Sequence, residues 1–259
     1  MKRIITALIL IPTITWIILK APNAVFLAAL AITGLLAYRE FDQIVAANGI
    51  KPAGWPGLAA GLVILFVPDR GVLVVLVAML GMVLAMRVSD LRMSMAAAGA
   101  FLIGVVYIFG SWHCVDLLRQ INPHWAMFAM ILSWAGDTAA LYAGKAFGKH
   151  KLAPRVSPAK TWEGAAGSAA GSLLVGLVYA HYLMPYEPLM LVCAAAVLGN
   201  ISGQLGDLCE SALKRGAGVK DSGNLLPGHG GWLDRIDASL FSVPVVYALV
   251  VLSLDLGPG

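Results

Sequence analysis

Long apolar segments follow one another along almost the whole chain, separated by short stretches rich in proline, glycine and charged residues. A helix needs about 20 apolar residues to cross a bilayer, and fewer where it is partly shielded by protein. Segments of this kind lie near 4–19, 23–38, 57–67, 71–86, 94–117, 125–146, 165–183, 189–209 and 238–254. The segment 57–67 is short, so it is expected to re-enter the membrane or to pair with 71–86. The pattern predicts an all-α polytopic integral membrane protein with about nine transmembrane helices.

Composition supports a membrane protein over a soluble one. Hydrophobic residues make up 59% of the chain and charged residues 12%, whereas a soluble domain is roughly 45–50% apolar and needs a charged surface. Cys114, Cys193 and Cys209 lack metal-site spacing and lie in apolar segments, so they are expected to be reduced packing residues. Lys2 and Arg3 precede an apolar run that also resembles a secretory signal, but an uncleaved first span is favoured because the rest is equally apolar.

The distribution of lysine and arginine predicts the orientation. With nine spans and a cytoplasmic amino terminus, every Lys and Arg except Lys20, Arg70 and Arg119 falls on the cytoplasmic side. This asymmetry is the one that membrane insertion favours. It also accounts for the net charge of +4 without a nucleic-acid partner, so none is expected.

One segment, 207–237, gathers much of the charge of an otherwise apolar chain. Its glycines and Pro227 break it into a loop that can bring backbone N–H groups close to a ligand. A polyphosphate bound to a divalent metal requires carboxylates for the metal, and cations and backbone N–H groups for the phosphates. The segment contains Asp207, Glu210, Lys214, Arg215, Lys220, Asp221, His229, Asp234, Arg235 and Asp237.

The acids of this segment are the candidate metal ligands. Asp207, Glu210 and Lys214 share one face of a helix by their spacing, and Ser211 lies on the same face. Pairs within the helix, Asp207 with Ser211 or Glu210 with Lys214, are the alternative. Because Mg²⁺ takes one or two carboxylates together with phosphate oxygens, Asp207 and Asp234 are predicted to hold it. Asp237 or Asp221 would support them, although Asp237 can equally cap the last helix.

The cations and glycines of the segment are candidate phosphate contacts. Lys214, Arg215, Lys220 and Arg235 suit a triphosphate and the pyrophosphate released from it, although surface cations also anchor to anionic lipid headgroups. His229 lies between glycines and is predicted to contact phosphate or to order the loop rather than to bind metal. Gly230 and Gly231 are predicted backbone donors.

Two further clusters are predicted to face the cytoplasm. Asp137 lies about 15 Å inside the end of the span 125–146, a depth at which an acid needs a cationic or metal partner. The stretch 157–164 combines hydroxyls, a cation and an acid, and Ser157, Lys160 and Thr161 are its candidate substrate contacts. Small residues in the spans 165–183 and 189–209 predict that these two helices touch.

The motif from Ser211 to Asp237, SALKR, four residues, then KDSGNLLPGHGGWLDRID, resembles the signature of the CDP-diacylglycerol synthases, also called phosphatidate cytidylyltransferases. The Gly-Asp-Thr element at 136–138, the Gly144 to Gly148 stretch and the loop SPAKTWEG also resemble family features, so the similarity covers roughly residues 130–240. Ala159 stands where a second lysine is common, and Ala238 where a serine is common. These departures bear only on those two positions as substrate contacts.

The resemblance implies a Mg²⁺-dependent transfer of CMP from CTP to phosphatidic acid, giving CDP-diacylglycerol and pyrophosphate without a covalent enzyme intermediate. It also implies membrane lipids as surroundings, a homodimer, and a bacterial-type inner (plasma) membrane with the site on the cytoplasmic face. Whether a second cation joins Mg²⁺ stays open. Within the chain, 1–120 would be an amino-terminal transmembrane region and 121–259 the catalytic region.

Other functions remain as alternatives. A CTP-dependent enzyme acting on another lipid, such as a polyprenol kinase or another lipid cytidylyltransferase, would share the triphosphate site and differ in the acceptor. An ion-coupled transporter would bury Asp137 and Asp207 along an ion path, but it does not need the glycine loop. The Asp-Gly-x-x-Ala-Arg run of CDP-alcohol phosphotransferases is absent from the sequence.

Overall fold

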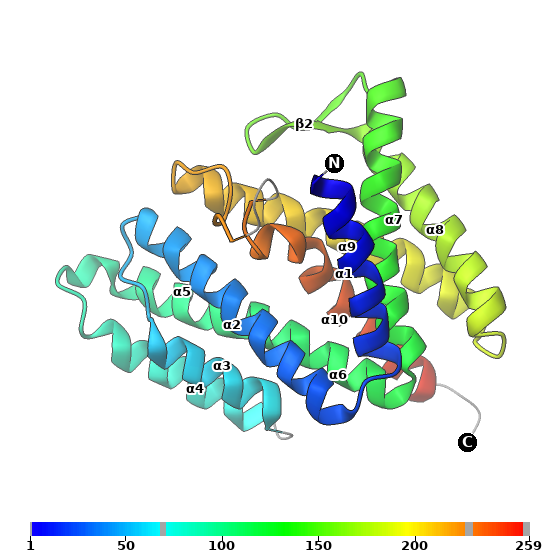
Figure 1. Ribbon diagram of the computed structural model, residues 1–259. Helices are drawn as coiled ribbons and strands as arrows, with labels where there is room; N and C mark the ends of the chain where they lie inside the picture. The colour runs from blue at the N-terminus through cyan, green and yellow to red at the C-terminus, as the bar shows by residue number, and fades with distance from the viewer. Residues whose placement is uncertain (1, 68–70, 226–229, 256–259) are drawn as a thin grey trace. The chain divides into compact units, whose positions relative to one another are not determined.

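The computed structural model describes residues 2–67, 71–225 and 230–255 and is almost entirely helical (Figure 1). The helices are α1 (Lys2–Leu19), α2 (Asn23–Ala47), α3 (Trp55–Phe66), α4 (Gly71–Ala85), α5 (Ser94–Val105), α6 (Ser111–Ile121), α7 (Pro123–Phe147), α8 (Trp162–Leu183), α9 (Leu189–Gly216) and α10 (Asp237–Asp255). Short 3₁₀ turns, η1 (Leu91–Met93) and η3 (Leu233–Arg235), precede α5 and α10. Strands β1 (Lys151–Ala153) and β2 (Ser157–Thr161) pair antiparallel, so the predicted loop before residue 164 is in part a β-hairpin.

Six helical segments of the described residues are long and apolar enough to cross a membrane. They are Asn23–Ala47, Leu91–Ile121, Pro123–Phe147, Trp162–Leu183, Leu189–Gly216 and Asp237–Asp255. The other three predicted spans correspond to the shorter apolar helices Ile9–Leu19, Trp55–Phe66 and Gly71–Ala85. The fold is that of a helical membrane protein, while the number nine and the cytoplasmic amino terminus stay predictions.

The segment Leu91–Ile121 is one helix with a π-helical turn, η2 (Val106–Gly110), in its middle. Such turns insert one extra residue and rotate the side chains that follow. The turn places Ile108 and Phe109 in the interior, where both are fully buried. Phe109 stacks on Tyr38 of α2 with ring centroids 5.8 Å apart.

The chain divides into two compact units, each of which is described by itself. The first combines Ala21–His113 with Leu213–Arg235 and the start of α1, and the second combines Ile14–Lys20 and Cys114–Ala212 with the segment from Ile236. In the first unit, glycines let aromatic rings approach the helices: Gly57 meets Tyr38, and Gly61 meets Phe109. The predicted functional division between 1–120 and 121–259 stays a prediction.

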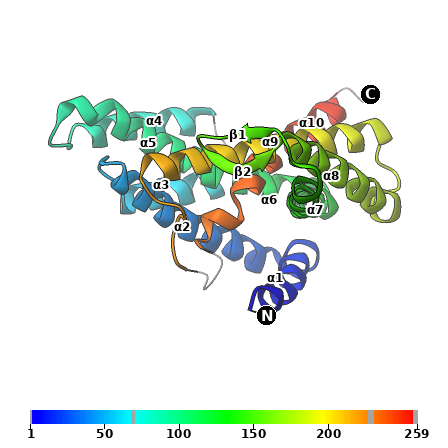
Figure 2. The same ribbon diagram turned by 90° about the horizontal axis from the view of Figure 1, so that it is seen from above.

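In the second unit, α7 and α8 pack side by side along small residues, and the hairpin β1–β2 joins them (Figures 1 and 2). Gly167 and Gly171 of α8 lie against Ala143 and Ala139 of α7, where a side chain at either glycine would collide with the alanine. Small residues of this kind let helix backbones approach closely in lipid.

The predicted contact between the spans 165–183 and 189–209 is confirmed by hydrogen bonds from Asn200 of α9. Its Nδ2 donates to Ser168 Oγ at 2.9 Å and to Ser172 Oγ at 2.8 Å. The glycines of the two helices serve other pairs, however, because those of α8 face α7, and Gly203 and Gly206 of α9 face the start of α10. Composition revealed that these helices pack closely but not which helix each glycine faces.

Candidate functional site

The first cluster of predicted residues forms around Asp234 and lies within the first unit. Lys214 Nζ, near the end of α9, lies 2.5 Å from Asp234 Oδ1, and both side chains are only 8% exposed. The backbone N–H of Gly231 donates to Asp234 Oδ2 at 2.7 Å, and that of Ser222 donates at 3.0 Å. These four residues, Lys214, Ser222, Gly231 and Asp234, are called the Asp234 cluster below.

The cluster holds Asp234 as a carboxylate. Burial alone raises the pKa of such a group, but the hydrogen bond from Lys214, the backbone donors and the positive charge of Lys214 outweigh it. The pKa of Asp234 is therefore lowered from its ordinary value of 3.8, and the group is ionised at neutral pH.

The surroundings of Gly230 and Gly231 leave no room for a side chain at either position. Gly230 has φ +78°, and a Cβ at this position would lie 2.7 Å from Asp234 Oδ2. A Cβ on Gly231 would collide with Ser222 Oγ and with the carboxylate of Glu40. At least one of the backbone donors predicted for a phosphate, Gly231 N–H, is thus directed to Asp234 within the protein.

Glu40 of α2 is part of this arrangement, and sequence reasoning missed it. It is 6% exposed, and it accepts hydrogen bonds from Ser222 Oγ and from the backbone N–H groups of Trp232 and Leu233 at 2.8–2.9 Å. The predicted span 23–38 ends two residues before Glu40, so this acid falls outside it. Helix α2 instead continues to Ala47 and buries Glu40. Because Glu40 follows Arg39 and comes two residues before Asp42, no local signal in the sequence marks it as buried.

The second cluster, around Asp207 of α9, lies within the second unit. Lys160 Nζ of β2 lies 2.5 Å from Asp207 Oδ2, and the two side chains are 26% and 33% exposed. Ser211 Oγ donates to Asp207 Oδ1 at 3.3 Å, so the predicted contact within the helix exists. Lys160 and Asp207, predicted separately from the hairpin and from α9, are brought together.

Asp237, at the start of α10, belongs to the same cluster. Its carboxyl group interacts with those of Glu210 and Asp207. Its Oδ1 accepts the N–H of the next residue, Ala238, at 2.8 Å, whereas a helix cap accepts from an N–H two or three residues further on. Asp207, Glu210, Asp237 and Lys160 are called the Asp207 cluster below. Three carboxyl groups with one lysine favour a further cation or a bound proton.

The hairpin that carries Lys160 is fixed by local hydrogen bonds. Thr161 caps α8, its buried Oγ accepting the N–H of Gly164 at 3.1 Å. Glu163 Oε1 lies 2.6 Å from His150 Nδ1, and the N–H of Trp162 donates to the carbonyl of His150 at 2.9 Å. Thr161 thus has a structural partner, while Ser157 is half-buried on β2. The hairpin places Lys160 by fixing both of its ends.

The other predicted residues are spread along the chain. Asp137 lies on the exposed part of α7, one residue after Gly136, which packs on the network of Asn200, Ser168 and Ser172. Arg215 is exposed and donates to the carbonyl of Val219 at 3.0 Å. Lys220, Asp221 and Arg235 are also exposed. His229 lies outside the described residues.

A divalent cation requires several oxygen donors close together. Within 2–67, 71–225 and 230–255, no group of three His, Cys, Asp or Glu side chains has the arrangement of a metal site. The donor chemistry of Asp207 and Asp237 nevertheless fits Mg²⁺, which takes carboxylate oxygens and keeps water or phosphate as its other ligands. Asp234 belongs to the other unit, and its oxygens already accept from Lys214 and from backbone N–H groups.

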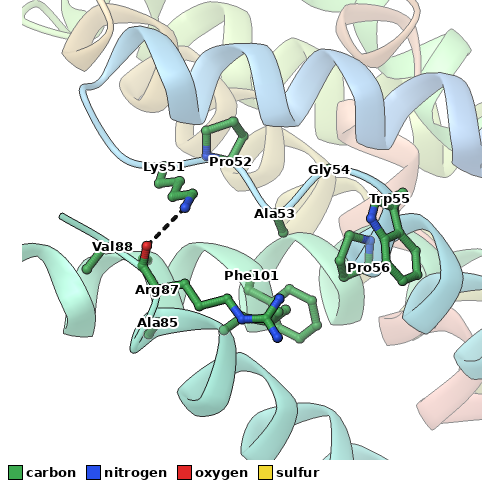
Figure 3. Close-up of a pocket in the computed structure, with 12 residues that line it drawn as sticks. Lys51, Pro52, Ala53, Gly54, Trp55, Pro56, Ala85, Arg87, Val88 and Phe101 are labelled. Atoms are coloured by element: carbon green, nitrogen blue, oxygen red, sulfur yellow. Dashed lines mark hydrogen bonds between the residues drawn. The ribbon is translucent and has the colours of Figure 1, made fainter.

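A pocket in the first unit lies under the connection between α2 and α3 (Figure 3). Residues 51–56 cover it, and its other walls come from the end of α4 and from Phe101 of α5. Lys51 Nζ donates to the carbonyl of Arg87 across it at 3.0 Å. The described residues that line this pocket include none of the predicted site residues.

Comparison with known proteins gives the same family over the whole chain. A profile of the cytidylyltransferase family matches residues 1–253. A protein named phosphatidate cytidylyltransferase from Staphylococcus aureus (strain COL) is 35% identical over 261 residues, covering 97% of this chain and 99% of the relative. Its namesake from Staphylococcus epidermidis (strain ATCC 35984) is 37% identical over 259 residues, covering 96% and 98%. The resemblance seen at residues 130–240 thus extends through the apolar first half, and the chain belongs to the cytidylyltransferase family.

Proposed function

We propose that this protein transfers CMP from CTP to phosphatidic acid and so forms CDP-diacylglycerol and pyrophosphate. One observation carries the proposal: relatives named phosphatidate cytidylyltransferase match this chain from end to end. The Asp234 and Asp207 clusters are compatible with this reaction, because each places a lysine beside a carboxylate.

The reaction requires charge neutralisation more than acid–base catalysis. The phosphate of phosphatidic acid is already an anion at neutral pH and attacks the α-phosphorus of CTP, so the protein must bring two anions together and stabilise the leaving pyrophosphate. Lys160 and Lys214 each hold a carboxylate partner at 2.5 Å. In the proposed reaction, phosphate oxygens of the substrates would bind these two lysines, either in place of the carboxylates or together with them.

The remaining predicted residues have supporting roles in this proposal. Arg215, Lys220 and Arg235 are exposed cations that would approach the triphosphate or the lipid headgroup. Ser157, Ser211 and Asp221 would orient the nucleotide. Asp137 would contact the substrate from α7 on the cytoplasmic side.

Mg²⁺ is the proposed cofactor. Asp207 and Asp237 would hold it, and the ion would neutralise the triphosphate and the pyrophosphate formed from it, while the role of Asp234 as a metal ligand stays a prediction from the sequence. The two carboxyl groups that interact with that of Asp237, those of Asp207 and Glu210, support this assignment, because a divalent cation stabilises carboxylates held close together.

Location and assembly complete the proposal. The cation distribution supports a site on the cytoplasmic face of a bacterial-type inner membrane, where CTP is present. A homodimer is proposed from the family resemblance alone.

Purified protein in lipid nanodiscs tests the function. With CTP, Mg²⁺ and phosphatidic acid, we expect pyrophosphate and a CDP-lipid in equal amounts, and neither product after chelation of Mg²⁺ by EDTA. Phosphatidic acid replaced by a polyprenol tests the alternative acceptor. An ion-coupled transporter would form neither product, and that result would refute the proposal.

A further inference from the structure

Glu40 is a buried carboxylate in the first half of the chain that reaches the segment carrying Asp234. Its Oε1 accepts the N–H of Trp232 at 2.9 Å, and its Oε2 accepts the N–H of Leu233 at 2.8 Å and Ser222 Oγ at 2.9 Å. These donors lie 182 to 193 residues away in the sequence. A buried carboxylate is tolerated only where such donors replace water.

Glu40 and Asp234 hold the same turn from two sides. Ser222 donates its hydroxyl to Glu40, and its backbone N–H donates to the carboxylate of Asp234 at 3.0 Å. Ser222 Oγ in turn accepts the N–H of Asp234 at 3.3 Å. The residues that Glu40 binds through backbone, Trp232 and Leu233, come directly before Asp234 in η3. Fixing them fixes the direction of the Asp234 side chain.

The space around Glu40 is closed, so its carboxylate has little freedom to move. A Cβ on Gly223 would lie 2.7 Å from Glu40 Oε1, and one on Gly231 would collide with Oε2. The space beside the Glu40 carboxylate therefore accommodates glycine but no residue with a side chain. Both glycines therefore bring their own backbone against Glu40, independently of any substrate.

We propose that Glu40 is a positioning residue for the Asp234 cluster: it sets the turn that directs Asp234 and Lys214 toward the phosphates of the substrate. Only the effect of Glu40 on catalysis rests on the proposed function. Its structural part, that Glu40 orders residues 219–225 and 230–235, is independent of the reaction.

The test compares Glu40→Gln with Asp42→Asn. Glutamine keeps the size of the side chain but has one acceptor oxygen, and its NH₂ would face a backbone N–H. Asp42 is the matched control, because it lies on the same helix and accepts backbone N–H groups of another loop, those of Gly54 at 2.7 Å and Ala53 at 3.3 Å.

Amide hydrogen exchange of peptides covering 219–236, in protein without substrate, is the first readout. We expect exchange there to rise at least tenfold in Glu40→Gln and to stay at the native rate in Asp42→Asn. The second readout is kinetic: kcat for CDP-lipid formation should fall at least tenfold in Glu40→Gln, with KM for phosphatidic acid unchanged.

Native exchange and native kcat in a folded Glu40→Gln protein would overturn the inference. So would faster exchange spread evenly over the first unit, which would indicate a general structural role. Should Glu40→Gln fail to fold, Ser222→Ala decides, because it removes one of the three bonds: local acceleration with reduced kcat supports the inference, and native values refute it. If the native protein forms no CDP-lipid, the proposed function is refuted, but hydrogen exchange still tests whether Glu40 orders the turn.

Discussion

At the scale of single residues, the charge state of Asp234 depends on Lys214 and on two backbone donors. Because its pKa is lowered, the stability that its ionised form contributes is fully present above the ordinary value of 3.8 and is lost as pH falls through the lowered pKa. We expect the native protein to have a higher Tm than Asp234→Asn from about pH 8 to about pH 5, and the difference to shrink below about pH 4.

Thermal unfolding in detergent across this pH range measures the effect. Asp221→Asn, at an exposed position of the same loop, serves as the control and should match the native Tm throughout. A native-to-Asp234→Asn difference that grows as pH falls below about pH 4 would contradict the sign.

Gly231→Ala tests the close approach of the loop to Glu40. The added Cβ has no room beside Ser222 Oγ and Glu40, so we expect a loss of about 2 kcal/mol or more in stability together with loss of activity. Gly99→Ala is the control, because nothing lies within 4 Å of a Cβ there, and it should be neutral or slightly stabilising. Equal Tm values for the two variants would show that the loop does not pack as described.

The sequence predicted the charged residues of both clusters but not all of their partners. Asp234, Lys214, Asp207 and Lys160 could be found because charged residues are rare in this chain and each cluster of charge stood out locally. Glu40 could not be placed, because its partners are nearly two hundred residues away and nothing local shows that α2 turns this acid inward. Likewise, spacing along α9 does not reveal that Lys214 pairs with Asp234.

At the scale of elements, α7 and α8 depend on small residues for their contact. In Gly167→Ala the new methyl group would collide with Ala143, so we expect a loss of about 2 kcal/mol. Ala143→Gly in the same protein should restore part of the stability, because it removes the colliding group. Tm values for the two single variants and the double variant measure the coupling. Strictly additive effects would contradict a direct contact.

The hairpin shows which element features follow from sequence. The predicted span ends at residue 146, one residue before the end of α7 at Phe147, and Thr161 ahead of an apolar run is typical of a helix start. The pairing of β1 with β2 was not predicted, because the strands have only three and five residues, too few for a pattern of alternation. That pairing is what positions Lys160 for Asp207.

At the scale of the whole molecule, the distribution of lysine and arginine predicts the orientation of the protein in the membrane. In a cysteine-free variant expressed in bacterial cells, we expect Tyr186→Cys, in the connection between α8 and α9, to react with a membrane-impermeant maleimide in intact cells. Arg155→Cys and Lys220→Cys should react only after the cells are opened. All three positions are exposed, so access depends on the side of the membrane. Labelling of Lys220→Cys in intact cells would place the Asp234 cluster on the wrong side.

The fate of the phosphorus atoms of CTP tests the central claim most directly. Native protein in nanodiscs is given phosphatidic acid, Mg²⁺ and CTP labelled either at the α-phosphorus or at the γ-phosphorus. The account predicts that the α-label enters the lipid as CDP-diacylglycerol and that the γ-label leaves as pyrophosphate. A γ-label in the lipid would show a kinase, and no label in any lipid would contradict nucleotidyl transfer altogether.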